Sequence, residues 1–149
     1  MKAVIFRRHG GPDVLECTDV PDPSPGPGQL LIRVKACALN HLDCWIRQGI
    51  AAYRIQLPHI SGCDVAGVVE RVGDGVTRFT PGDRVVLAPG LSCGRCEHCQ
   101  RGDDNLCVSY GIRGAAVDGG YAELVLARAA DALPLPPDLP FEQAAAFPL

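Results

Sequence analysis

Four cysteines lie within fifteen residues of this chain: Cys93, Cys96, Cys99 and Cys107. Two-residue gaps allow one tight loop to present successive sulfurs to a single point, and Gly94 relieves backbone crowding between the first two. The longer gap to the fourth cysteine lets the chain wrap around the same point. Four thiolates complete a tetrahedral shell around zinc and leave no position for water or substrate. The spacing therefore predicts a structural zinc site, not a catalytic one.

Other interpretations of this segment are an iron–sulfur cluster, two disulfides, or a zinc site in which His98 replaces one cysteine. Arg95 and Arg101 lie nearby in the sequence, and we expect them to offset the charge of the thiolates. The N-terminal segment MKAVIFRR reaches charged residues too early to be a signal peptide. We therefore expect a cytoplasmic protein with reduced thiols. The remaining cysteines are expected to be small buried hydrophobic residues: Cys17, Cys37, Cys44 and Cys63.

The rest of the chain reads as short strands separated by turns, because 17 glycines and 13 prolines punctuate short apolar runs. Alternating or apolar segments predict strands at 2–6, 30–36, 65–72, 84–87 and 121–126. A helical period predicts one helix over 40–48, closed by Gly49, with Trp45 in the core. A mainly β fold, a barrel or sandwich, is expected.

Composition limits the possible partners. With a net charge of −3 and no basic stripe, nucleic-acid binding has little electrostatic support. The apolar runs are too short for a membrane span. A chain of 149 residues favours one domain. A helix begins at about residue 140 and the sequence stops soon afterwards, so we expect a longer parent chain.

Five motifs, together with the cysteine segment, carry a resemblance to a known family. They are GGPDVL at 10–15, ALNHLD at 38–43, GVVERVG at 67–73, PGDRV at 81–85 and GGYAE at 119–123. With these motifs the chain resembles the N-terminal GroES-like catalytic domain of the medium-chain dehydrogenase/reductases, which include zinc-type alcohol dehydrogenases and quinone oxidoreductases.

The resemblance implies a partly open GroES-like barrel over residues 1–149, with short helices and a zinc lobe at about 91–110. In this family a Rossmann domain follows, and the helix from about 140 would lead toward it. The chain has no Gly-x-Gly-x-x-Gly motif, so we expect that domain to be absent here and the 149 residues alone to be inactive.

The departures from the family pattern concern a second, catalytic zinc. Zinc-type members have a cysteine ligand where this chain has Asn40, and a hydroxyl residue for proton relay where it has Leu42. They have His-Glu where this chain has Cys63 and Asp64, which we expect to point to opposite faces of a strand. His41 or Asp43 could still supply a ligand, but we expect no catalytic zinc. The candidate catalytic residues are Asn40, His41, Asp43, Tyr53, Cys63 and Asp64.

Quinone oxidoreductase-like members have an asparagine at the matching position, which implies that Asn40 hydrogen-bonds to substrate or nicotinamide. Its alternative role is a helix N-cap. Asp43 is expected to hold neighbouring groups or to act as a first-turn carboxylate. Tyr53 is expected to line the substrate entrance or to be ordinarily half-buried.

The resemblance implies a function for the parent protein: hydride transfer between NAD or NADP and a small alcohol, aldehyde, ketone or quinone, in a homo-oligomer that contacts neither nucleic acid nor membrane. A zinc-dependent alcohol dehydrogenase with two zinc ions per subunit is the first alternative. A stand-alone zinc-binding interaction module is the second.

Overall fold

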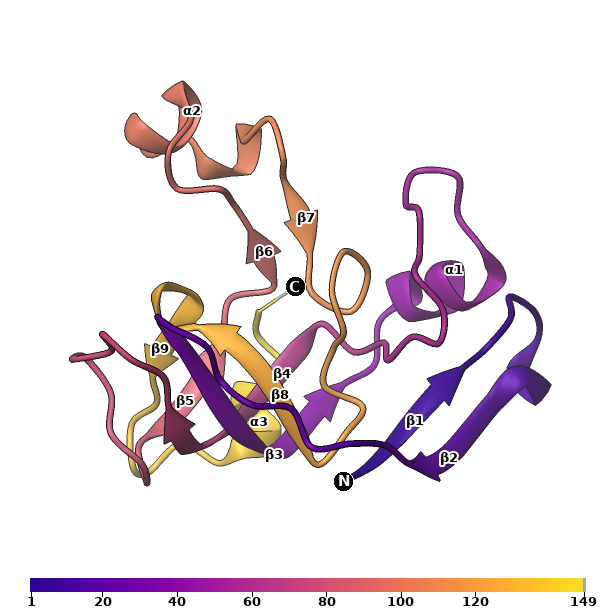
Figure 1. The fold of residues 1–149 in the computed structure, drawn as a ribbon, viewed down its shortest axis with the longest axis horizontal. Helices are drawn as coiled ribbons and strands as arrows, with labels where there is room; N and C mark the ends of the chain where they lie inside the picture. The colour runs from indigo at the N-terminus through magenta and orange to yellow at the C-terminus, as the bar shows by residue number, and fades with distance from the viewer. Residues whose placement is uncertain (149) are drawn as a thin grey trace.

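A five-stranded antiparallel sheet forms the centre of the protein in its computed structural model, which describes residues 1–148 (Figure 1). The strand order is β8-β3-β4-β5-β9. The bounds are β3 Gln29–Ala38, β4 Asp64–Val72, β5 Arg84–Leu87, β8 Leu124–Arg128 and β9 Ala132–Pro134. The strand predicted at 121–126 is observed at 124–128, as β8. The GGYAE segment at 119–123 precedes this strand and leads into the sheet.

The inner face of β3 shows why this segment is a strand. Leu30 and Ile32 are fully buried in the main core cluster, while Arg33 and Lys35 face solvent. Register shifts within the β3–β4 pairing interrupt the strict alternation between Leu31 and Ile32. The predicted alternation is confirmed from Ile32 to Lys35, whereas Leu31, which lies next to the register shift, is buried as well.

A hairpin of β1 (Lys2–Phe6) and β2 (Leu15–Asp19), with a 3-10 turn at Pro12–Val14, lies beside the central sheet. Isolated bridges join it to Ala122 and His59. The mainly β architecture expected from the sequence is confirmed. Within residues 1–148 the strands pair as open sheets of five, two and two strands and do not close into a barrel.

Helix α1 (His41–Gln48) follows β3, with Asn40 at its N-cap and Gly49, at φ 90°, at its C-cap. Ile46 packs inward and is fully buried. The expectation that Trp45 belongs to the core is wrong: it is 53% exposed and stacks on the ring of His41, one helical turn away. Trp45 therefore lies on the solvent-exposed face of the helix.

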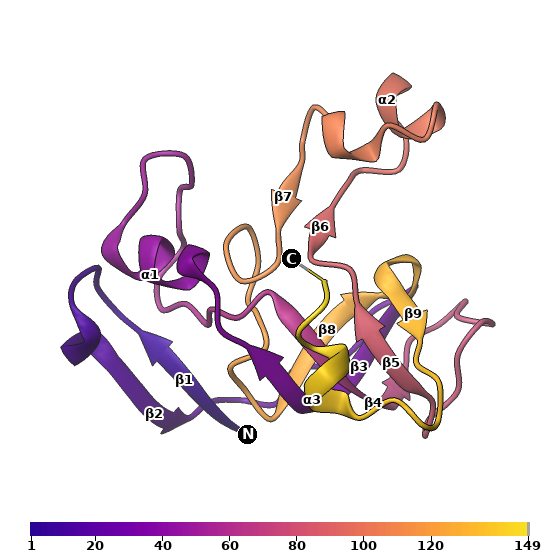
Figure 2. The ribbon, with the colours of Figure 1, turned by 180° about the vertical axis from the view of Figure 1, so that it is seen from behind.

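The cysteine segment forms a lobe that extends away from the sheets in both views (Figures 1 and 2). Strands β6 (Gly90–Leu91) and β7 (Gly111–Ile112) pair to form its stem. A short helix α2 (Glu97–Gln100) and a 3-10 turn at Asp104–Leu106 form its tip. A third 3-10 turn, at Ala129–Asp131, joins β8 to β9.

Near the end of the described chain, α3 (Phe141–Ala144) forms where a helix start was predicted and packs on β3 and β4. Ala144 and Ala145 are buried there against Ala66. None of the helices in residues 1–148 has the length and apolarity needed to cross a bilayer.

Candidate functional site

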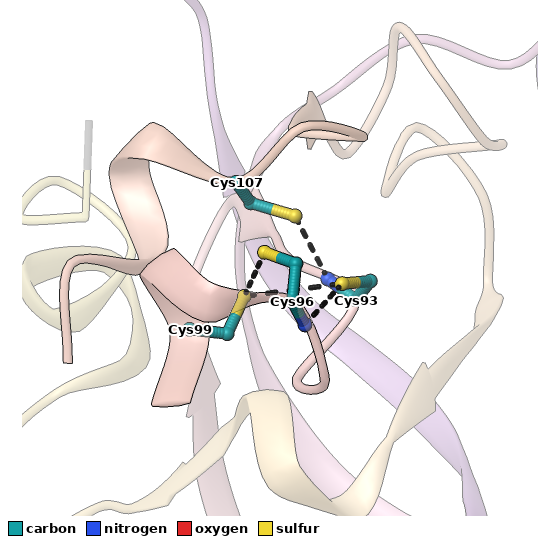
Figure 3. Close-up of side chains that lie close together, drawn as sticks. All are labelled: Cys93, Cys96, Cys99 and Cys107. Carbon is teal, nitrogen blue, oxygen red and sulfur yellow. Dashed lines mark hydrogen bonds between the residues drawn. The ribbon is translucent and has the colours of Figure 1, made fainter. Parts of the chain in front are cut away.

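The four lobe cysteines converge on one point (Figure 3). Their sulfur atoms all lie within 4.8 Å of one another, with 3.5 Å between Cys96 and Cys99 and 4.0 Å between Cys93 and Cys99. A tetrahedral zinc with Zn–S bonds of about 2.3 Å requires sulfurs about 3.8 Å apart, whereas a disulfide requires about 2.0 Å. The arrangement fits a four-thiolate metal site.

Backbone amides prepare these sulfurs to carry negative charge. The N–H of Cys93 donates to Cys107 Sγ at 3.2 Å, and the N–H of Ser109 donates to the same sulfur at 3.4 Å. These bonds, the one from Cys93 foremost, lower the pKa of Cys107 to about 6. Burial raises the pKa of Cys99 to about 11, so a bound cation would be needed to deprotonate it. The four cysteines thus combine one thiol that ionises readily, Cys107, with one, Cys99, that a bound cation would have to deprotonate.

Three charged or titratable side chains lie near the cysteines of the lobe: His98, Arg101 and Arg128. His98 lies outside the group of metal-ligating atoms and faces Arg101, with 3.5 Å between its Nδ1 and the guanidinium. Arg101 forms an ion pair with Glu97 at 3.1 Å. Arg128, far along the chain, donates to the carbonyl of Ser92, next to the first cysteine, at 2.5 Å.

A second cluster of polar side chains forms where α1 begins and β4 begins. Asn40 Nδ2 donates to Asp64 Oδ2 at 2.8 Å and to Cys63 Sγ at 3.3 Å. The expectation that Cys63 and Asp64 point to opposite faces is therefore wrong. Cys63 precedes β4 and follows Gly62, whose φ of 101° turns the chain before the strand alternation starts.

Asp43 joins the segments of this cluster. Its Oδ2 accepts hydrogen bonds from the backbone N–H of Asn40 at 2.8 Å and from the hydroxyl of Tyr121 at 2.7 Å. Its Oδ1 accepts from the N–H of Gly62 at 3.0 Å. Sequence reasoning missed Tyr121, although the GGYAE motif that contains it was noted. Only the fold brings it to α1, because the two lie 78 positions apart.

The cluster is poor in positive charge. None of the hydrogen bonds that Asp43 and Asp64 accept within residues 1–148 comes from a cationic side chain. Burial raises the pKa of Cys63 to about 12 and also raises the pKa of Asp64, which the bond from Asn40 partly opposes. Burial, helped by the bond to Asp43, raises the pKa of Tyr121 as well. At neutral pH the thiol and the phenol are therefore protonated.

Two predicted site residues lie outside this network. His41 is exposed beside Trp45. Tyr53 is half-buried against a cluster that contains Phe6 and Ile46. A cavity of about 900 Å³ lies between the β1–β2 hairpin and β8, and none of the predicted site residues lines it. The structure thus brings together Asn40, Asp43, Cys63 and Asp64, but not His41 or Tyr53.

A comparison with protein-family models matches residues 26–137 to the alcohol dehydrogenase GroES-like domain. An alcohol dehydrogenase of Schizosaccharomyces pombe is 37% identical over 144 residues, which cover 96% of this chain and 41% of the relative. A quinone oxidoreductase of Rattus norvegicus is 38% identical over 148 residues, which cover 99% of this chain and 37% of the relative.

Among solved structures, an NAD-dependent alcohol dehydrogenase superposes with a TM-score of 0.96 at 54% identity. The match covers all of this chain and 43% of that one. The chain therefore spans about two-fifths of the length of the proteins that it matches.

Proposed function

Because the chain belongs to the family of alcohol dehydrogenase GroES-like domains, we propose that it is the substrate-side domain of an NAD(P)-dependent oxidoreductase. The reaction would move a hydride between the nicotinamide and a small alcohol, aldehyde, ketone or quinone. Relatives named for alcohol and for quinone substrates match almost the whole chain and support this range. In the whole protein, α3 would lead toward a cofactor-binding domain.

The observation that carries the proposal is the unequal pair of hydrogen bonds made by the Asn40 amide. The bond to Asp64 at 2.8 Å fixes the side chain, while sulfur is a weak acceptor for the second N–H at 3.3 Å. A substrate oxygen can displace Cys63 as the partner of this second N–H. Asn40 would then stabilise negative charge that develops on that oxygen, while the nicotinamide supplies or accepts the hydride.

The chemistry of the same three residues argues against a catalytic zinc. Cys63 and Asp64 could both act as ligands, and they do converge. However, the atom between them is the amide nitrogen of Asn40, which presents hydrogens and has no lone pair to donate to a metal. We propose that this cleft works through hydrogen bonds.

The lobe is proposed to hold one structural zinc through Cys93, Cys96, Cys99 and Cys107. The sulfur separations and the N–H···S bonds support it. Four sulfur ligands fill the shell, so this zinc would organise the lobe and take no part in the reaction.

The test uses the whole protein, its metal content and the Asn40→Ala variant. We expect one zinc per chain and a fall in turnover of about 100-fold, which is typical of losing one donor to a developing oxyanion. Asn105→Ala, at an exposed asparagine of the lobe, is the matched control and should leave turnover unchanged.

Three results would contradict the proposal. Two zincs per chain, with activity sensitive to mild chelation and indifferent to Asn40→Ala, would identify a zinc-dependent alcohol dehydrogenase. One zinc with unchanged turnover in Asn40→Ala would remove the role of this residue. Absence of turnover with NADH or NADPH across aldehydes, ketones and quinones would favour an interaction module.

A further inference from the structure

Tyr121 is held in a fixed position by both its backbone and its hydroxyl. Its N–H donates to the carbonyl of Ser61 at 3.0 Å, and its carbonyl accepts from the N–H of Val4 at 2.8 Å. Its hydroxyl donates to Asp43 Oδ2 at 2.7 Å and lies 3.2 Å from the carbonyl oxygen of Ala38. Tyr121 therefore touches β1, the end of β3, helix α1 and the loop before β4.

The ring of Tyr121 packs directly on the backbone of Gly62. A Cβ atom at Gly62 would lie 2.8 Å from ring atom Cδ1 of Tyr121 and 2.8 Å from Cys37 Sγ. Both distances are shorter than van der Waals contact, so the glycine allows this close approach. The ring consequently fixes the position of the residue that immediately precedes Cys63.

Asp43 connects Tyr121 to the rest of the cluster through hydrogen bonds. The carboxylate is 8% exposed and accepts hydrogen bonds from Tyr121, from the N–H of Asn40 and from the N–H of Gly62. A buried carboxylate that loses one donor moves or recruits a replacement, because an unsatisfied buried charge is costly. Any movement of Asp43 would shift the backbone of Asn40 and the loop that carries Cys63 together.

We propose that Tyr121 is a positioning residue that acts through Asp43 to orient the Asn40 amide toward the substrate. The inference rests on the proposed function, in which Asn40 meets the substrate oxygen. Tyr121 itself does not touch the reacting atoms. Since burial raises the pKa of its phenol, the hydroxyl remains a donor across the neutral range.

The experiment is a double-mutant cycle of Tyr121→Phe and Asn40→Ala in the whole protein, with steady-state kinetics. Tyr121→Phe keeps the ring on Gly62 and removes only the hydroxyl. We expect kcat to fall about 10-fold, with KM for the nicotinamide cofactor changed by less than about twofold, because a small misplacement of a positioning group weakens the transition state alone.

In the Asn40→Ala background, Tyr121→Phe should have no further effect on kcat, because the group that it orients is gone. Tyr110→Phe, at a 43% exposed tyrosine of the lobe, is the control and should match the unaltered protein. Asp43→Asn is a second variant, and it should reproduce the fall in kcat because its amide nitrogen cannot accept the same bonds.

A crystal structure of Tyr121→Phe gives a readout that does not depend on activity. We expect the Asn40 Nδ2 to Asp64 Oδ2 contact, 2.8 Å in the unaltered protein, to lengthen while the central sheet is unchanged. A kcat within twofold of the unaltered protein, or effects of the two substitutions that multiply, would overturn the inference. Unchanged turnover in Asn40→Ala would instead refute the proposed role of Asn40, and the crystal structure would then decide the positioning role by itself.

Discussion

At the scale of single residues, the chain places its cysteines in three different environments. The lobe cysteines surround one point, Cys37 and Cys63 lie inside the fold, and Cys17 and Cys44 are exposed on β2 and α1. Burial raises the pKa of both Cys37 and Cys63 to about 12. The thiolate is the reactive form of cysteine, so these environments should differ in reactivity.

We predict that iodoacetamide at pH 8 labels Cys44 much faster than Cys63 in the native protein. The thiolate fraction of a thiol with a pKa of about 12 is on the order of 1,000-fold lower at this pH than that of an ordinary exposed thiol. Peptide mapping by mass spectrometry measures both rates. The two rates should become similar in denaturant, and equal rates in the native state would refute the environment described for Cys63.

At the scale of elements, the junction between the loop before β4 and helix α1 depends on Gly62. This residue has a φ of 101° and lies against Tyr121 and Cys37, while its N–H donates to Asp43. Any other residue would be strained here for two reasons. L-residues rarely adopt this φ, and there is no space for a Cβ atom. Glycine therefore fits this position of the cluster without strain, whereas any other residue would destabilise it.

We predict that Gly62→Ala destabilises the protein by roughly 2 kcal/mol more than Gly82→Ala. Gly82 has nearly the same φ, 99°, but a Cβ atom there would meet nothing within 4 Å. Both variants carry the same kind of backbone strain, so their difference isolates the overlap with Tyr121 and Cys37. Urea unfolding measures it, and equal stability of the two variants would contradict the close packing.

At the scale of the whole molecule, the central sheet and the lobe are stabilised in different ways. The sheet encloses the main apolar cluster, which includes Leu30, Ile32 and Val65. In the lobe between 93 and 110, Cys107 is the only buried residue. Since no apolar core supports the tip of the lobe, the zinc proposed to bind its four sulfur atoms would supply its order.

We predict that chelation of zinc disorders residues 93–110 and leaves the central sheet folded. Hydrogen exchange should accelerate in the lobe while the amides of β3 and β4 stay protected. Cys96→Ser should give the same pattern without a chelator, whereas His98→Ala, outside the ligand set, should retain the metal. Loss of protection in β3 and β4 on chelation would show that the lobe and the sheet unfold as one unit.

Local features of the sequence were sufficient for several parts of this structure. The spacing of the four cysteines predicted their convergence, because ligands within fifteen residues need only a tight loop to meet. Alternation predicted β3, and Asn40 and Gly49 marked the two ends of α1. Strands β2, β6, β7 and β9 were missed, because β6, β7 and β9 have only two or three residues each and β2 is almost wholly exposed.

The cluster of Asn40, Asp43, Cys63 and Asp64 could be recognised only from the tertiary structure. Asn40, Cys63 and Tyr121 belong to segments far apart in the chain, and only the packing of α1 against the loop before β4 and the approach to β8 brings them together. Periodicity placed Cys63 and Asp64 on opposite faces, but the turn at Gly62 aims both at one amide. Spacing along the chain thus determined the candidate metal site, whereas long-range packing determined which polar groups meet in the cleft, because hydrogen bonds between distant segments exist only once the core has formed.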